Sequence, residues 1–130
     1  MSYSLHGLAH IGMIVRDREV TAAFYTRHLG FVRAGERTID TPEGTIHILF
    51  LKNEELVLEC IQKPVYNEAH GEGIFVHVAI DVTGIEELGA YLDQCGVKWV
   101  EELRVNSDVG NKSMLFEGPD GEILEINEKI

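Results

Sequence analysis

Hydrophobic residues recur along the chain with two periods, and each period predicts a different secondary structure. Residues 8–15 (LAHIGMIV) form an apolar, β-rich run that predicts a buried strand. Residues 20–25 carry a helical stripe, with Asp17 as a suitable N-cap and Gly30 placed just past the C-terminus. Three further β-rich runs, bounded by turn residues, predict strands at 31–38, 45–51 and 55–61.

The second half of the chain repeats this order of elements. A strand is expected at 74–82 and a helix near 85–95, which Gly96 ends. Strands near 97–104, 112–117 and 122–127 follow, and Asp120-Gly121 is a strong hairpin-turn signal. Each half therefore reads as β-α-β-β-β, and the turn-rich segment 62–73 joins the halves. The pattern predicts an α+β fold.

Matched residues in the two halves support an internal repeat. His10 and His77 are 67 positions apart, as are Phe24 and Tyr91. Phe50 and Phe116 are 66 apart, and the same interval separates Glu59 from Glu125. We expect one domain over residues 1–130, with module one at about 5–63 and module two at about 74–130.

Charge and composition exclude several classes of partner. The chain has 11 Lys+Arg against 22 Asp+Glu, a formal net charge of −11, whereas nucleic acids and anionic membranes require a basic face. No signal-like segment opens the sequence, and no apolar run approaches the ~20 residues of a membrane span. The two cysteines form no C-x-x-C pair. These features predict a cytoplasmic protein, and the acidic charge does not exclude an anionic small molecule as a ligand, because a bound divalent cation can reverse the local potential.

Four ionisable residues stand inside otherwise apolar strand segments and are the candidate site. They are His10, Glu59, His77 and Glu125. Buried charges persist when they are paired or bound to a metal, and pseudo-twofold packing of the modules would let all four converge. Two imidazoles and two carboxylates suit Ni2+, Co2+, Zn2+, Mn2+ or Fe2+. Considered singly, each histidine could be a structural residue and each glutamate could face solvent, but four such residues at matched positions of a repeat favour a shared metal.

These residues carry a resemblance to a known superfamily along essentially the full chain. The opening HIGMIVRD…FYTRHLGF and the ending FEGPDGEILEINE resemble the vicinal oxygen chelate superfamily (glyoxalase/bleomycin resistance/dioxygenase). The His-Glu-His-Glu order, at intervals of 49, 18 and 48 residues, resembles most closely the short bacterial glyoxalase I, a lactoylglutathione lyase. The resemblance implies two β-α-β-β-β modules whose curled mixed sheet surrounds a metal-binding cup.

The same resemblance implies a reaction. A lyase of this type converts the hemithioacetal of an α-oxoaldehyde and a thiol to a 2-hydroxyacyl thioester, by proton transfer through an enediolate, and so detoxifies methylglyoxal. It implies Glu125 as the preferred base, with Glu59 able to share that role. It favours Ni2+ or Co2+, with Zn2+ as an alternative, and a homodimer in which two chains can share the metal.

Two positions depart from the glutathione-binding pattern of short glyoxalases. Ile14 stands where they typically carry Arg, and Lys63 where they tend to carry Asn. The thiol is therefore left open, as are two other functions: a methylmalonyl-CoA epimerase-like epimerase, and a non-catalytic drug- or small-molecule-binding protein. Four cationic side chains are candidate anchors for an anionic substrate tail, against the alternative of solvated surface charges: Lys63, Arg33, Arg37 and Lys112.

Overall fold

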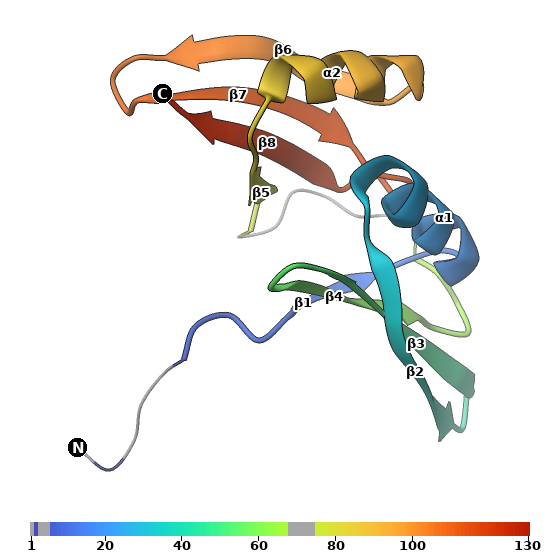
Figure 1. Cartoon of the computed structure of the whole chain (residues 1–130). Coiled ribbons are helices and arrows are strands. Elements are labelled where there is room, and N and C mark those ends of the chain that lie inside the picture. The colour runs from blue at the N-terminus through green and yellow to red at the C-terminus, as the bar shows by residue number, and fades with distance from the viewer. Residues whose placement is uncertain (1, 3–5, 68–74) are drawn as a thin grey trace. The chain divides into compact units, whose positions relative to one another are not determined.

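The chain folds into two compact units, each with its own sheet and helix (Figure 1). The computed structural model describes residues 2, 6–67 and 75–130. Unit 1 spans Met1–Asn67 and unit 2 spans Glu68–Ile130. The boundary falls within the segment expected to join the two modules, of which residues 68–73 lie outside the described part.

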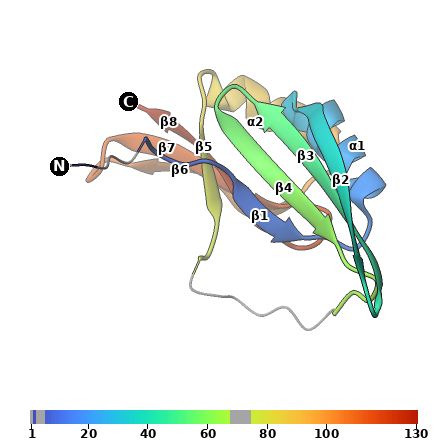
Figure 2. The ribbon, with the colours of Figure 1, turned by 90° about the horizontal axis from the view of Figure 1, so that it is seen from below.

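Unit 1 is a four-stranded mixed sheet covered on one face by a helix. Its sheet order is β1-β4-β3-β2, visible as four neighbouring ribbons in Figure 2. β1 runs parallel to β4, and the other neighbours are antiparallel. In chain order the elements are β1 (Ile11–Ile14), α1 (Arg18–Leu29), β2 (Val32–Thr41), β3 (Gly44–Asn53) and β4 (Leu56–Gln62).

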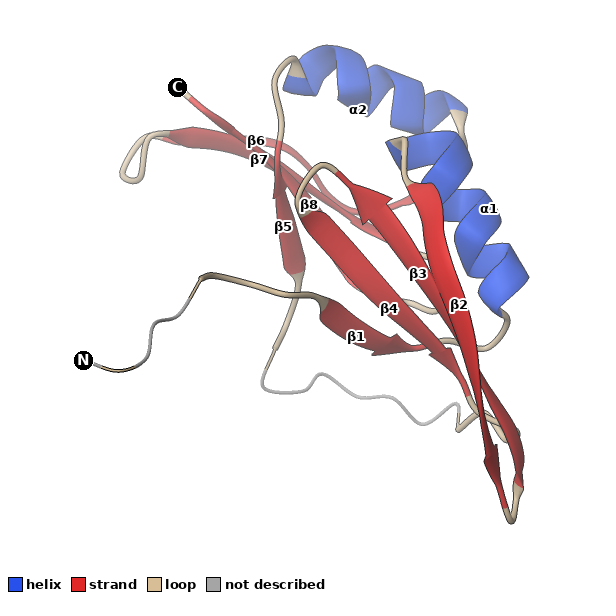
Figure 3. Cartoon of the chain, turned by 60° about the horizontal axis from the view of Figure 1, so that its bottom comes forward, coloured by secondary structure: helices blue, strands red, loops and turns tan. Residues whose placement is uncertain are grey.

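Unit 2 repeats the same topology. The strands of its sheet lie in the order β5-β8-β7-β6 (Figure 3). β5 and β8, which come first and last along the chain, run parallel, and the other neighbours are antiparallel. Neither helix in the described residues is long and apolar enough to cross a membrane. The elements are β5 (Val78–Asp81), α2 (Ile85–Gln94), β6 (Lys98–Asn106), β7 (Asn111–Glu117) and β8 (Ile123–Lys129).

The expected α+β architecture of two β-α-β-β-β modules is confirmed, and each module forms a sheet of its own. The two candidate histidines were expected within the first strands, but both lie just outside them. β1 begins one residue after His10, and β5 begins one residue after His77. Residue 74, the expected start of the second module, lies outside the described residues.

Alternate residues of each sheet form a core against the helix. In unit 1, Leu49, Leu51, Leu58 and Cys60 share the face that meets α1, and each is at most 1% exposed. In unit 2, Met114, Phe116, Leu124 and Ile126 take the same place beneath α2. A Cβ on Gly89 of α2 would lie 2.7 Å from the Met114 sulfur, so glycine permits this close approach.

The last strand of each unit hydrogen-bonds to the N-terminus of that unit's helix. The Gln62 side chain accepts a hydrogen bond from the Arg18 backbone N–H at 2.8 Å, beside the expected N-cap Asp17, which accepts from Glu19. In unit 2 the N-cap is Gly84, which has no side chain. The Glu128 carboxylate of β8 takes the role of the missing capping side chain and accepts hydrogen bonds from the backbone N–H groups of Gly84 and Ile85 at 2.7 and 3.3 Å. These carboxylate and amide oxygens satisfy amides that a helix leaves unpaired.

The two units differ in the hairpin that leads into the last strand. Asn53 pairs with Leu56 in unit 1, whereas Glu117 pairs with Ile123 in unit 2, so the second hairpin has a longer loop. As a result Phe50 lies opposite Glu59, but Leu115, not Phe116, lies opposite Glu125. The repeat of Phe50 and Phe116 expected from their spacing is therefore wrong. A one-residue offset turns Phe116 into the core.

The core beneath α1 makes a direct stability prediction. Leu49→Ala removes a fully buried side chain and leaves a cavity, so the free energy of unfolding should fall by about 2–5 kcal/mol. Urea titration monitored by circular dichroism measures the loss. Val32→Ala is the matched control, since Val32 is 61% exposed and should change stability little. Equal effects of the two substitutions would contradict this description of the core.

The Glu128 contact to α2 makes a second prediction. Glu128→Ala should lower the free energy of unfolding by about 1–2 kcal/mol, because two helix N–H groups lose their acceptor. Glu128→Gln keeps one acceptor oxygen and should cost less. Thermal unfolding of both variants measures the difference. If the alanine variant proved as stable as the original chain, water would replace the carboxylate equally well.

Candidate functional site

A histidine and a glutamate meet at the parallel strand pair of unit 1. Glu59 on β4 has Gly12 of β1 as its cross-strand partner, and His10 lies two residues before Gly12. Alternate residues point to the same face of a sheet, which brings the imidazole beside the carboxylate. His10 Nε2 lies 3.5 Å from Glu59 Oε2. The glutamate is the more buried partner, with 20% of its side chain exposed against 46% for the histidine.

Unit 2 places a second pair in the same register. Glu125 on β8 has Ala79 of β5 as its partner, and His77 lies two residues before Ala79. His77 Nε2 lies 3.4 Å from Glu125 Oε2, and the glutamate is again the more buried of the two. Because the strand partner, the two-residue offset and the distance all recur, the repeat is structural as well as sequential.

The spacing within each pair fits two ligands of one cation. Ligand atoms that lie ~2.0–2.2 Å from a metal, at tetrahedral or octahedral angles, are about 3–3.5 Å apart. Both Nε2–Oε2 distances agree with this range. In residues 2, 6–67 and 75–130, neither unit joins a third His, Cys, Asp or Glu to its pair. Each unit by itself therefore supplies one imidazole and one carboxylate.

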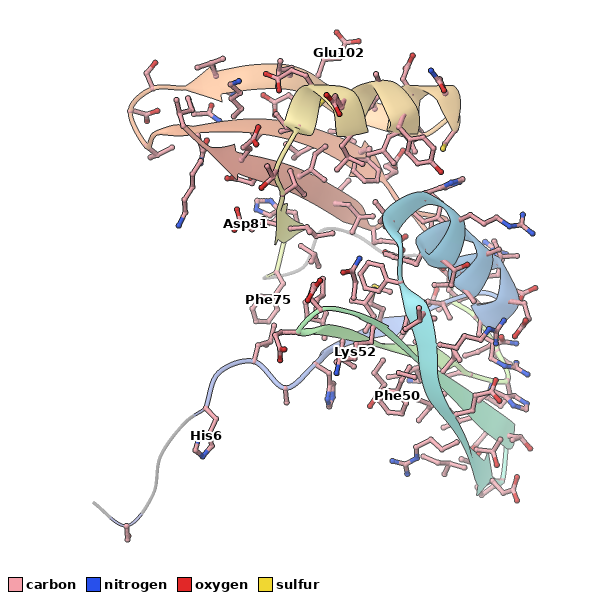
Figure 4. All side chains as sticks on the ribbon, viewed as in Figure 1. His6, Phe50, Lys52, Phe75, Asp81 and Glu102 are labelled. Carbon is pink, nitrogen blue, oxygen red and sulfur yellow. The ribbon has the colours of Figure 1, made fainter. Side chains whose placement is uncertain are left out.

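The surroundings of Glu59 are apolar. Phe50 of β3 is its partner on the side away from Gly12, and the Phe50 ring meets the His10 imidazole edge-on, with 6.4 Å between ring centroids. Figure 4 labels Phe50 on the strand that also carries Lys52. One step further along the same face, three isoleucines stand side by side on neighbouring strands: Ile14, Ile61 and Ile48.

The surroundings of Glu125 are polar. Asn127, two residues further along β8, donates a hydrogen bond from Nδ2 to Glu125 Oε1 at 2.8 Å. The row that corresponds to the three isoleucines of unit 1 consists of Asp81 (Figure 4), Asn127 and Ser113. Asn127 was not among the candidates from sequence. Its position two residues after Glu125 in a strand was the available signal, because such residues share a face.

Two of the four candidate anchors are held by helix carboxylates. Arg33 pairs with Glu19 of α1 at 2.5 Å, and Lys112 pairs with Glu86 of α2 at 2.6 Å. These hydrogen bonds raise the pKa of both cations. Register places Arg33 opposite Leu51 and Lys112 opposite Glu128, on the helix-facing side of each sheet. Both positions therefore lie on the face away from the His–Glu pairs.

The other two anchors are placed differently. Arg37 of β2 is paired with Ile48, two positions from Phe50, so it lies on the Glu59 face and is exposed. In unit 2 the residue in the same row is Arg104, paired with Ser113. Lys63 is exposed and follows the end of β4 directly. Of the four candidates, Arg37 is thus the one that strand register aligns with a His–Glu pair.

Comparison with known proteins supports the superfamily expected from sequence. The family model described as "Glyoxalase/Bleomycin resistance protein/Dioxygenase superfamily" matches residues 7–126. The uncharacterized protein YaeR of Escherichia coli (strain K12) is 30% identical over 129 residues, covering 92% of this chain and 94% of YaeR.

Solved structures agree with this assignment. The glyoxalase family protein from Enterococcus faecalis has a TM-score of 0.77 at 30% identity, covering 94% of this chain and 97% of that protein. The fosfomycin resistance protein FosX from Listeria monocytogenes, complexed with Mn(II) and sulfate, shares the fold with a TM-score of 0.73 at 19% identity, covering 98% and 95%. The chain belongs to the glyoxalase/bleomycin resistance protein/dioxygenase superfamily.

Proposed function

We propose that His10, Glu59, His77 and Glu125 bind one divalent cation, and that the protein is a metal-dependent isomerase of the glyoxalase I type. The observation that carries the proposal is the His–Glu pair repeated in the same register, with 3.5 and 3.4 Å between Nε2 and Oε2. Catalytic metal sites in proteins commonly use three or more protein ligands, so one pair alone is insufficient. The Mn(II) complex of FosX, a neighbour in fold, supports a divalent cation.

The donor set indicates the class of metal. Two imidazole nitrogens and two carboxylate oxygens suit borderline divalent ions, and water or substrate can complete the shell. We propose Ni2+ or Co2+, following the resemblance to short glyoxalases, with Zn2+ as the alternative. Four protein ligands can come from one chain or from two chains of a homodimer, and the donor set is the same in both cases.

The proposed reaction is a proton transfer between neighbouring carbons of a hemithioacetal. A bound cation would supply Lewis acidity to the adjacent substrate oxygens. His10 and His77 would act as metal ligands, and one of the two glutamates would take the proton from the carbon that bears the sulfur and hydroxyl. The same carboxylate would return that proton to the neighbouring carbon, and the hydroxyl proton would pass to the oxygen of that carbon, which yields the 2-hydroxyacyl thioester. Phe50 and the isoleucine row give Glu59 apolar neighbours on its face of the sheet.

The apolar face of unit 1 bears on the identity of the thiol. Ile14 has Ile61 as its strand partner, and Ile61 has Ile48, so no charge stands in this row between β1 and β3. Arg37 ends the row on β2. This arrangement favours a thiol with an apolar portion and one anionic group over the highly polar glutathione. We therefore propose a hemithioacetal of an α-oxoaldehyde with such a thiol as the substrate.

A second candidate is an epimerase that acts on a thioester. The observation that favours it is one carboxylate per unit in the same register, because epimerisation removes a proton from one face of a carbon and returns a proton to the other. Two separate carboxylates can divide these two steps. The reaction shares its acid–base chemistry with the isomerase and differs in needing both glutamates to exchange protons with the substrate.

Metal stoichiometry tests the ligand set. Metal-stripped protein titrated with Co2+ or Ni2+ should bind about one ion per chain, because the two histidines and two glutamates of each chain make up the ligand set of one ion. His10→Ala and His77→Ala should each lower the affinity about 10-fold or more, since either change removes a ligand. His6→Ala is the matched control. Two ions per chain would show that each pair binds alone, and the absence of binding would refute the site.

Turnover tests the reaction. The protein reloaded with Ni2+, Co2+ or Zn2+ is mixed with methylglyoxal and a panel of thiols, and thioester absorbance is followed. Activity should require metal and favour a thiol less polar than glutathione. Replacing the proton-transferring glutamate by glutamine should lower kcat ~100-fold or more.

Glu55→Gln, in the exposed β3–β4 turn, is the control for a surface carboxylate. Stoichiometric metal binding without turnover on any thiol would favour the epimerase, which proton–deuterium exchange of a CoA thioester would then detect.

A further inference from the structure

The two glutamates of the proposed site have the same register but different neighbours. Two residues after Glu125, Asn127 donates to Glu125 Oε1 at 2.8 Å, and Oε2 lies 3.4 Å from His77. Both oxygens of this carboxylate thus have a defined partner within unit 2. A carboxylate with one oxygen held by an amide offers its other oxygen to a metal in a fixed orientation.

Glu59 lacks this support. Two residues after it stands Ile61, whose side chain has no donor, and its cross-strand neighbours are Gly12 and Phe50. Within the part of the chain that the structure describes, the Glu59 carboxylate contacts His10 through Oε2. On the β1 side the cross-strand partner is Gly12, which has no side chain and therefore presents no side-chain donor to Glu59.

We infer that Asn127 is a positioning residue which anchors Glu125 as the fixed carboxylate ligand, and that Glu59 is the carboxylate that leaves its ligand position and carries the proton. The inference rests on the proposed metal site and divides the work of its two glutamates. It differs from the role that family resemblance implies, in which Glu125 is the preferred base.

The proton balance of the step is simple. The substrate C–H bond breaks, an O–H bond forms on Glu59, and the electron pair stays on the substrate. The O–H bond then breaks as the proton passes to the neighbouring carbon, and Glu59 returns to its starting state. The hydroxyl proton of the first carbon passes to the oxygen of the neighbouring carbon, so that the first carbon becomes the thioester carbonyl and the neighbouring carbon bears the hydroxyl. A carboxylate that must leave its ligand position and return does so more readily when no neighbouring side-chain donor holds it, which is the arrangement at Glu59. A carboxylate tied to Asn127 would first have to lose a hydrogen bond.

A reciprocal exchange of the two supporting residues tests the anchor without reference to turnover. Asn127→Ile gives Glu125 the neighbour that Glu59 has, and Ile61→Asn gives Glu59 the neighbour that Glu125 has. Co2+ affinity is measured by chelator competition, together with the visible spectrum of bound Co2+. Asn127→Ile should weaken binding ~10-fold and change the spectrum, because loss of an outer hydrogen bond typically costs 10–100-fold in metal affinity.

The controls keep this arm interpretable. Lys129→Ile alters the next residue on the same face of β8 and should leave Co2+ affinity within about 2-fold. Asn127→Ser retains a hydroxyl donor and should recover part of the affinity. Thermal unfolding verifies that each variant is folded. An unchanged affinity and spectrum in folded Asn127→Ile would overturn the anchoring role.

The glutamates are then separated at saturating metal. Glu59→Gln should lower kcat ~100-fold or more with a smaller loss of Co2+ affinity, whereas Glu125→Gln should weaken Co2+ binding more and retain kcat within ~10-fold. Ile61→Asn should lower kcat while it preserves metal binding, since it restrains the mobile carboxylate. The reverse pattern, with kcat lost in Glu125→Gln and retained in Glu59→Gln, would overturn the inference.

Failure of the inference can be distinguished from failure of the proposed function. If the original chain binds no metal, the proposed site itself is wrong. If it binds one ion per chain but turns over no hemithioacetal, the reaction is wrong, and the Co2+ affinities of Asn127→Ile and Ile61→Asn still decide whether Asn127 is an anchor.

Discussion

Parallel pairing between the first and the last strand of each unit is the constraint on which the rest of the molecule depends. A β-α-β-β-β segment returns its last strand to the side of its first, and the helix makes the crossover in between. This pairing places the residue before the first strand next to the centre of the last strand. His10 and Glu59 therefore become neighbours although 49 residues separate them, and His77 and Glu125 follow the same rule.

Local sequence patterns predicted most of the fold. Apolar periodicity located all ten elements, and the helix signals Asp17 and Gly30 sit at the ends of α1, where Gly30 takes the left-handed conformation that favours glycine. The α+β class and the two-module organisation are confirmed as well. Two signals selected the four candidate ligands. Each is an ionisable residue in an apolar strand segment, and each recurs at the matched position of the other module.

Features that depend on which face a residue occupies, or on partners far along the chain, were not predictable. Spacing alone equated Phe50 with Phe116, but a longer hairpin loop shifts the register by one residue and turns Phe116 inward. Nothing near Lys112 in the sequence indicates a partner, but its ammonium group forms an ion pair with Glu86 of α2, 26 residues earlier in the chain. The caps that Gln62 and Glu128 supply come from the opposite end of each unit. The contact of Lys112 and the two caps are long-range contacts without a local signature, whereas the register of Phe116 depends on the length of a hairpin loop.

The last strand of each unit carries separate tasks on its two faces. In β8, Glu125 and Asn127 lie on one face, while Leu124, Ile126 and Glu128 serve the core and the helix on the other. A slip of one residue would bury the polar set and expose the apolar set, which is costly in free energy on both counts. The strand is therefore protected against misalignment during folding. Because both faces of β8 carry required side chains, an insertion or deletion within this strand would disrupt the site and the core together. Changes in substrate specificity are therefore expected to arise by substitution in this strand.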